Sequence, residues 1–249
     1  MQVARNEQYV ANRRRLRARV SLLAFSLLIV VLVLPFFFEQ SFVFLWPLFF
    51  IVFVATNASK QLQFEWGAGL LADERLAQAL KVLNNRYWFG AYIPIGRYVV
   101  NHLLIGPEGV LVIETRNHPG EIRCQNGRWS RKGGSLSRIF GPIPPVGNPS
   151  RDLDAAVSAV DKEIESAGLG KVPVSGAVVF TAPDANIELT DCPTTTLTLT
   201  QLEAWAAGRR SSAVEVVNDA TRQKLIQHFA DLMPRAQVAG STSSRRSTR

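Results

Sequence analysis

The stretch NHLLIGPEGVLVIETRN, residues 101–117, decides the fold that this sequence is expected to adopt. Its centre, residues 106–109, reads Gly-Pro-Glu-Gly, which is typical of a turn between two apolar runs, so the stretch predicts a β-hairpin. If the runs pair symmetrically about this turn, Asn101 lies opposite Glu114 on one face. Arg116 shares that face, because side chains alternate along a strand. The hairpin is therefore expected to aim an amide, a carboxylate and a guanidinium at one spot, as either a functional site or a structural Glu–Arg pair.

Strand and helix patterns alternate on both sides of this hairpin. Strands are predicted at 87–95, 97–105, 109–115, 120–124, 127–131, 172–182 and 194–199, and helices at 70–83, 150–167, 200–207 and 213–233. Asn126-Gly127 is typical of a tight turn between two of these strands. The order indicates one mixed α/β domain over residues 61–235. The Ser-, Thr- and Arg-rich tail at 236–249 is expected to be disordered.

Two apolar runs precede this domain. Residues 20–38 form a run of nineteen without a charge, about 28 Å as a helix and close to the thickness of a bilayer core. A second run follows at 42–56. Together they predict a transmembrane hairpin of two helices over residues 20–58. The alternatives are a single span with a re-entrant piece, or a signal peptide, which the absence of a small-residue cleavage site disfavours.

The net charge of +8 belongs to the ends of the chain and not to the domain. Residues 1–20 carry six Arg and one Glu, and residues 239–249 carry three Arg, so the charges between them sum to zero. The basic arm at 1–19 precedes the first apolar run and places that end in the cytoplasm by the positive-inside rule. Two spans return the chain to the same side, which predicts a multi-pass cell-membrane protein with both termini cytoplasmic. The arm is expected to contact lipid headgroups, with a nucleic-acid-binding arm as the alternative.

The hairpin stretch resembles the core of the NERD (nuclease-related domain) family. That family typically reads I-D-H, two or three apolar residues, G-P, G-V and then I-E-T-K-N with a glycine nearby. Gly120 supplies that glycine, Trp129 stands where a tryptophan is common, and Asn148-Pro149 resembles the family's N-P-x-x-Q. The resemblance covers about residues 66–233. It implies a restriction-endonuclease-like mixed sheet flanked by helices, preceded here by the transmembrane hairpin.

The resemblance also implies a site, and this sequence departs from it. In that fold an Asp, a Glu and a Lys on a strand hairpin bind a divalent metal, Mg²⁺ or Mn²⁺, and position a water for phosphodiester hydrolysis. Glu114 is kept, but Asn101 stands in the Asp place and Arg116 in the Lys place. Asp152 stands in the place of the family's Gln, and Asp73 stands where the family has Glu.

Two hypotheses for the site follow. In the first, Glu114, Arg116 and Asn101 are the catalytic residues of a metal-dependent nuclease acting on DNA or RNA. Asp73 and Asp152 would then join Glu114 in a shifted Mg²⁺ or Mn²⁺ site. In the second, the site is degenerate, because Asn removes a negative charge and Arg cannot give up its proton. The domain would then be a catalytically inactive module, tethered to the lipid bilayer, that binds nucleic acid or other proteins.

A basic stretch follows the hairpin and predicts a nucleic-acid contact. Residues 116–138 carry five net positive charges with interleaved aromatic residues, a pattern typical of surfaces that follow a phosphate backbone. The candidate contacts are Arg123, Arg128, Arg131 and Lys132. An edge hairpin protected by solvated charges is the alternative.

The cysteines and two histidines are expected to be structural. Cys124 and Cys192 have neither metal spacing nor a disulfide framework, so they are expected to be packing residues in a reduced compartment. His102 faces the side opposite to Asn101, where a core or helix contact is expected. His118 lies in the loop beyond Arg116 and is expected to be solvated.

Overall fold

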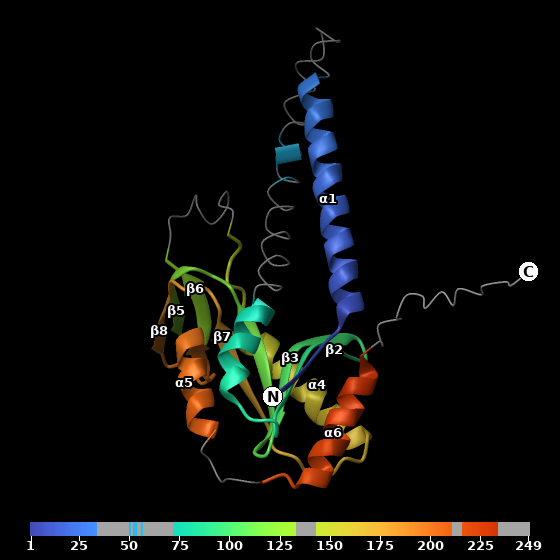
Figure 1. Ribbon diagram of the computed structural model, residues 1–249. Helices are drawn as coiled ribbons and strands as arrows, with labels where there is room; N and C mark the ends of the chain where they lie inside the picture. The colour runs from blue at the N-terminus through green and yellow to red at the C-terminus, as the bar shows by residue number, and fades with distance from the viewer. Residues whose placement is uncertain are drawn as a thin grey trace, which may run out of the picture.

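The computed structural model describes residues 1–33, 50, 52–53, 56, 72–132, 143–210 and 216–233. Figure 1 shows a mixed α/β domain from which one long helix, α1 (Glu7–Val33), projects. The mixed sheet flanked by helices that the sequence predicts is confirmed.

The main sheet has six strands in the order β1-β2-β3-β4-β7-β9. Their bounds are β1 (Gln2–Arg5), β2 (Trp88–Ile95), β3 (Tyr98–Gly106), β4 (Gly109–Arg116), β7 (Val174–Phe180) and β9 (Thr196–Thr198). The β2–β3 and β3–β4 pairs are antiparallel, whereas β1–β2, β4–β7 and β7–β9 are parallel. Ile105 pairs with Val110, so the predicted register of the central hairpin is confirmed.

A smaller sheet of three strands, in the order β6-β5-β8, continues from the end of β4. It contains β5 (Gly120–Gln125), β6 (Arg128–Arg131) and β8 (Ala185–Thr190). Asn126 and Gly127 both have positive φ, as the tight turn between β5 and β6 requires. The sequence did not predict β8, which pairs in parallel with β5 from a distant part of the chain.

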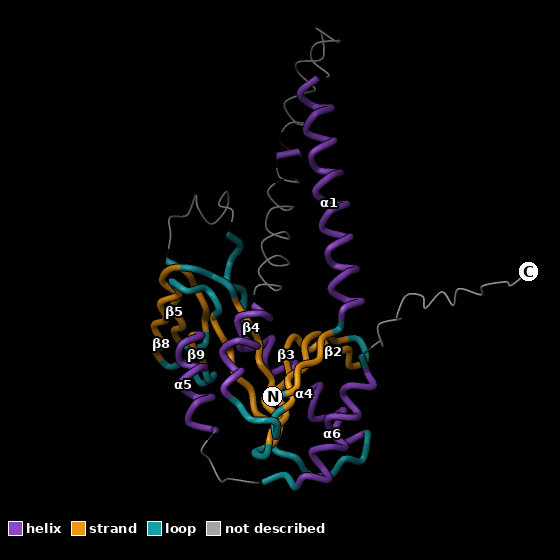
Figure 2. Tube along the Cα trace, in the orientation of Figure 1, coloured by secondary structure: helices purple, strands orange, loops and turns teal. Residues whose placement is uncertain are grey.

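Helices cover both faces of the main sheet, as Figure 2 shows. On one face, α4 (Pro149–Ser166) and α6 (Asp219–Leu232) bury an apolar core with Val110 and Val112 of β4. On the other face, helical residues 72–79, the 3-10 helix η3 (Leu80–Val82) and α5 (Leu199–Arg210) pack on Leu104 and Ile113. Because side chains alternate along β4, Glu114 belongs to the α4 face and Ile113 to the opposite one.

The N-terminal residues are part of the sheet. Residues 2–5 were expected to belong to a basic arm, but β1 pairs with β2, where Gln2 lies beside Trp88 and Arg5 beside Ala91. The amide side chain of Asn6 donates to the carbonyl of Tyr92 (3.1 Å) and its Oδ1 caps the start of α1. The chain therefore passes directly from the edge of the sheet into α1.

α1 includes residues 20–33 of the first predicted span. The rest of that run and nearly all of the second, at 42–56, lie outside the described residues. Within the described part of the chain, no helix is long and apolar enough to cross a membrane. The transmembrane hairpin therefore remains a prediction from the sequence.

Cys124 and Cys192 form a disulfide, with their Cα atoms 6.0 Å apart. The expectation of two unpaired packing cysteines was wrong. The disulfide joins β5 to the segment that follows β8, and parallel pairing of these strands brings the two cysteines together. Residues 68 positions apart in the sequence meet only through this pairing, so spacing along the chain gave no sign of it.

Candidate functional site

Asn101 and Glu114 meet on the α4 face of the central hairpin, where the predicted register puts them. The side-chain amide of Asn101 donates to Oε2 of Glu114 over 2.9 Å. Arg116, two residues farther along β4, donates from Nη1 to the other oxygen of the same carboxylate. Both oxygens of Glu114 therefore accept a hydrogen bond from a neighbour on the hairpin.

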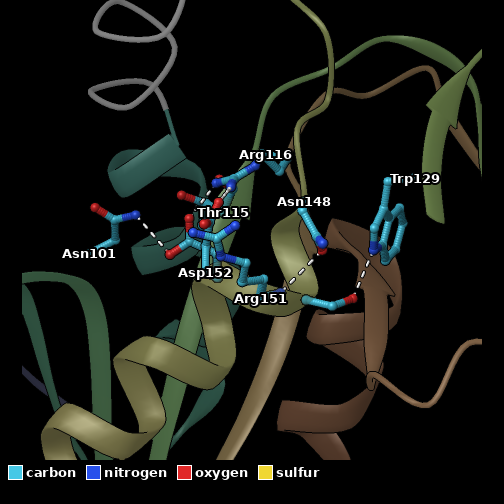
Figure 3. A network of polar contacts seen from close by, with 9 residues as sticks. Asn101, Thr115, Arg116, Trp129, Asn148, Arg151 and Asp152 are labelled. Atoms are coloured by element: carbon cyan, nitrogen blue, oxygen red, sulfur yellow. Dashed lines mark hydrogen bonds and ion pairs between the residues drawn. The ribbon is translucent and has the colours of Figure 1, made fainter. Parts of the chain in front are cut away.

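Asp152 reaches the same spot from the first turn of α4. Asn148 caps this helix by accepting a hydrogen bond from the backbone N–H of Arg151 (3.2 Å), and Pro149 occupies its first position. Nη2 of Arg116 donates to Oδ2 of Asp152. Figure 3 shows the guanidinium of Arg116 extended toward Asp152, with Asn101 on the other side of the cluster. Arg116 thus bridges two carboxylates that come from a strand and a helix.

The two carboxylates differ in their exposure to solvent. The Glu114 side chain is 9% exposed and the Arg116 side chain 17%, whereas that of Asp152 is 52% exposed. A buried carboxylate is costly unless a positive group compensates it. Arg116 supplies this compensation for Glu114, while about half of the Asp152 side chain stays exposed to water.

These donors do not fit a divalent cation as they are arranged. Mg²⁺ and Mn²⁺ require converging oxygen ligands, but a guanidinium lies between Glu114 and Asp152 and an amide N–H points at Glu114. Among the described residues, no group of three or more His, Cys, Asp or Glu side chains could hold a metal ion. The arrangement stabilises the fold, and neither Glu114, whose two oxygens both accept hydrogen bonds, nor Arg116, which keeps its proton, is free to act as a base on water.

Asp73 lies on the opposite side of the sheet from Glu114. Its Oδ1 is 2.7 Å from Nε2 of His102, and its Oδ2 is 3.2 Å from the guanidinium of Arg5. His102 pairs with Ile113 and so faces away from Glu114, in the core contact that the sequence predicted. The structure therefore does not bring Asp73 together with Glu114 and Asp152. Burial, followed by the negative charge of Asp73, raises the pKa of nearby Tyr92.

A second polar network beside the site joins Arg75 and Asn117, neither of which was predicted as a site residue. Arg75 donates to Oδ1 of Asn117 (3.3 Å) and to the carbonyl of Thr181 (2.8 Å). The Thr181 hydroxyl also donates to Oδ1 of Asn117. Asn117 is the last residue of the I-E-T-R-N run. Its position in the sequence, close to Glu114 and next to Arg116, could have identified it as a residue of the site. The network links the helix at 72–79 to the ends of β4 and β7.

His118 is buried, with 4% of its surface exposed, so the expectation of a solvated loop histidine was wrong. Burial lowers the pKa of His118 to about 4, and the positive charges of Arg116 and then Arg131 act in the same direction. The carbonyls of Pro144 and Pro145 oppose this shift only in part. His118 is therefore a neutral imidazole at physiological pH, held against the loop that leads into α4.

The predicted basic contacts lie on the small sheet or at its edge, and acids pair with two of the four. Nε of Arg123 is 2.6 Å from a carboxylate oxygen of Glu188, and Nζ of Lys132 is 2.7 Å from Glu121. The hydrogen bond from Lys132 lowers the pKa of Glu121. Arg128 is exposed. This face therefore carries less net charge than the sequence suggested.

Arg131 and Trp129 face the other way. Arg131 pairs with the buried Ile122 and so shares its inward face. Trp129 donates from its indole N–H to the Ser150 hydroxyl (2.8 Å) and packs on Phe180. Its ring supports the start of α4 and is not presented to solvent as a stacking platform.

Comparison with known proteins adds one relationship. The chain matches no curated protein and no solved structure. A family model does match: residues 68–181 match NERD, the nuclease-related domain, which supports the family resemblance of this part of the chain.

Proposed function

We propose that this chain is a membrane-attached, nuclease-related module that binds nucleic acid without cleaving it. The observation that carries the proposal is the bridge from Arg116 to Glu114 and Asp152. The guanidinium of Arg116 occupies the position where a metal would have to contact both carboxylates. The nuclease-related family supplies the expectation of a nucleic-acid ligand.

The chemistry of the substituted residues supports a binding role over hydrolysis. A guanidinium keeps its proton at any physiological pH, so Arg116 cannot activate a water as a lysine could. Asn101 directs its amide N–H at Glu114, which uses one carboxylate oxygen, and Arg116 uses the other. Glu114 is then a compensated structural anion. A metal-dependent phosphodiesterase is the competing function.

Exposed side chains of α1 support attachment to a membrane. Leu22, Leu23 and Phe25 each expose more than half of their surface, which is costly in water and favourable in lipid. Five arginines lie just before them on the same helix, which favours a cytoplasmic start by the positive-inside rule.

The pairing of β1 with β2 supports an even number of crossings. β1 precedes α1, β2 follows the second apolar run, and both belong to one sheet. The N-terminal residues and the domain therefore lie on one side of any membrane that the chain enters. With the arginines, this supports a multi-pass cell-membrane protein with both termini cytoplasmic.

Exposed cations support a nucleic-acid ligand over an uncharged one. Arg128 lies on the outward face of the small sheet, and residues 8–33 of the N-terminal region contain five arginines and no acid. Contacts of this kind bind phosphates with an affinity that falls as salt rises. Both DNA and RNA meet this requirement, and an acidic protein surface is the other partner class to test.

The test uses the full chain in neutral lipid nanodiscs, with labelled single-stranded DNA or RNA and Mg²⁺ or Mn²⁺. We expect salt-sensitive binding, weakened by Arg128→Glu, and no cleavage. Glu188→Gln is the matched control on the same sheet, because it removes an acid and should not weaken binding. Cleavage that Glu114→Ala abolishes would overturn the proposal and support the phosphodiesterase. Absence of both binding and cleavage would overturn it in favour of a protein partner.

A further inference from the structure

The strands of the main sheet fix where the candidate site lies relative to α1. β1, β2, β4 and β7 run in the same direction, because β3 is antiparallel to both β2 and β4 and the remaining pairs are parallel. Glu114 and Arg116 lie at the carboxyl end of β4, and Thr181 follows the carboxyl end of β7. The site therefore lies at the same end of the sheet as Arg5, the last residue of β1.

α1 leaves the domain from that same end. Asn6 alone separates β1 from α1, and it is fixed on both sides, since its N–H donates to the carbonyl of Ala91 (3.1 Å) and its side chain to that of Tyr92. Arg5 is held by the buried Asp73, and the ring of Tyr9 lies against that of Tyr92 with centroids 5.1 Å apart. The base of α1 is thus packed on the sheet, and Figure 1 shows the helix projecting from it.

The first half of α1 forms a basic stalk, residues 7–19, between the domain and the apolar residues. From Glu7 to Arg19 the helix rises about 18 Å. A headgroup layer is about 5–8 Å thick, so Arg17 and Arg19, next to the apolar run, fall within it. Arg14 and Arg15 lie about 8–9 Å below residue 20, on the domain side of that layer, and both are exposed.

We propose that the end of the sheet that carries the candidate site faces the bilayer, and that nucleic acid bound by the chain runs between domain and membrane along Arg14 and Arg15. This inference rests on the proposed function and adds the path of the ligand. It assigns two different roles to the arginines of the stalk. Arg14 and Arg15 contact phosphates of the ligand, whereas Arg17 and Arg19 contact lipid headgroups.

Two measurements on the full chain in vesicles of neutral lipid test the proposal. The first compares energy transfer to a headgroup acceptor from dyes on Arg97→Cys and Lys171→Cys. Arg97 follows the carboxyl end of β2, and Lys171 precedes the amino end of β7; both are exposed. Because the sheet is about 25 Å high along its strands, we expect clearly stronger transfer from position 97.

The second measurement compares Arg14→Gln/Arg15→Gln with Arg17→Gln/Arg19→Gln, which remove equal charge. We expect the first pair to reduce the salt dependence of single-strand binding by about 1.4 in log–log slope, as two lost phosphate contacts should. We expect the second pair to leave that slope unchanged.

The outcomes distinguish this proposal from the proposed function. Equal transfer from the two dyes, or stronger transfer from position 171, overturns the orientation. A wild-type chain that binds nucleic acid but is unaffected by Arg14→Gln/Arg15→Gln overturns the ligand path alone. A wild-type chain that reaches vesicles but binds no nucleic acid overturns the proposed function together with that path.

Discussion

Arg116 donates a hydrogen bond to Glu114, a partner only two residues away on the same strand. The pair therefore forms within β4 itself and does not depend on how the helices pack. The link from Arg116 to Asp152, in contrast, requires α4 to lie across the end of the strand. One guanidinium thus combines a local contact with a tertiary one.

Removing Arg116 should destabilise the fold. Arg116→Ala leaves Glu114 buried without a compensating charge, so we expect the free energy of unfolding to fall by about 3 kcal/mol. Asp152→Asn, at the exposed end of the same network, should cost less than about 1 kcal/mol. Urea unfolding of both variants measures the difference. If both variants lost the same free energy of unfolding, the burial of Glu114 would not be what determines the loss of stability.

Introducing the residues typical of the nuclease-related domain family, which residues 68–181 match, should create a metal site. Asn101→Asp/Arg116→Lys replaces an amide by a carboxylate opposite Glu114 and removes the guanidinium that bridges to Asp152. We expect Mn²⁺ to raise the midpoint of thermal unfolding of this double variant and to leave that of the wild type unchanged. Asn101→Asp alone, which keeps the bridge, is the control and should show no Mn²⁺ effect. If Mn²⁺ also stabilised the wild type, this would contradict the claim that the bridge from Arg116 to the two carboxylates prevents metal binding.

His118 should make the stability of the fold depend on pH. Its pKa is lowered from 6.5 to about 4 in the folded state, so the unfolded chain binds more protons between these values. Stability is then full above pH 6.5 and is lost as the pH falls toward 4. The whole loss is about 3 kcal/mol. Urea midpoints between pH 4 and 8 should show a shallower slope for His118→Gln than for the wild type, and identical slopes would contradict the assignment.

The central hairpin could be predicted because its information is local. A turn at residues 106–109 fixes the register, and the register fixes which side chains share a face. Asn101, Glu114 and Arg116 were brought together correctly for this reason. The same reasoning put His102 on the opposite face.

The contacts that the sequence did not predict are those between distant elements. β1 has only four residues and is recognisable only beside β2. Asp73 was expected near Glu114, but the helix at 72–79 packs on the other face of the sheet, where His102 bonds its carboxylate. Helical periodicity shows which residues share a face of that helix, and it does not show which face of the sheet the helix covers.

Attachment through α1 can be tested with single charges. Leu22→Asp and Leu23→Asp each put a carboxylate on the exposed apolar surface of the helix, at a cost of about 2.5–3.5 kcal/mol in a bilayer core. We expect both variants to shift from the membrane fraction to the soluble fraction in flotation. Val216→Asp is the matched control, because Val216 is also exposed but belongs to the domain. Equal behaviour of all three variants would contradict attachment through this helix.

The disulfide gives a test of the compartment that the domain faces. The cytoplasm keeps most protein thiols reduced, so a cytoplasmic domain should have Cys124 and Cys192 reduced in intact cells and linked only after purification in air. Acid quenching followed by alkylation traps the state in cells. A disulfide already present there would contradict the cytoplasmic placement and favour an oxidising compartment.

In the purified chain, Cys124→Ser should lower the free energy of unfolding by about 4 kcal/mol, because the bond closes a long loop. Reductant should reproduce that loss in the wild type and leave the variant unchanged.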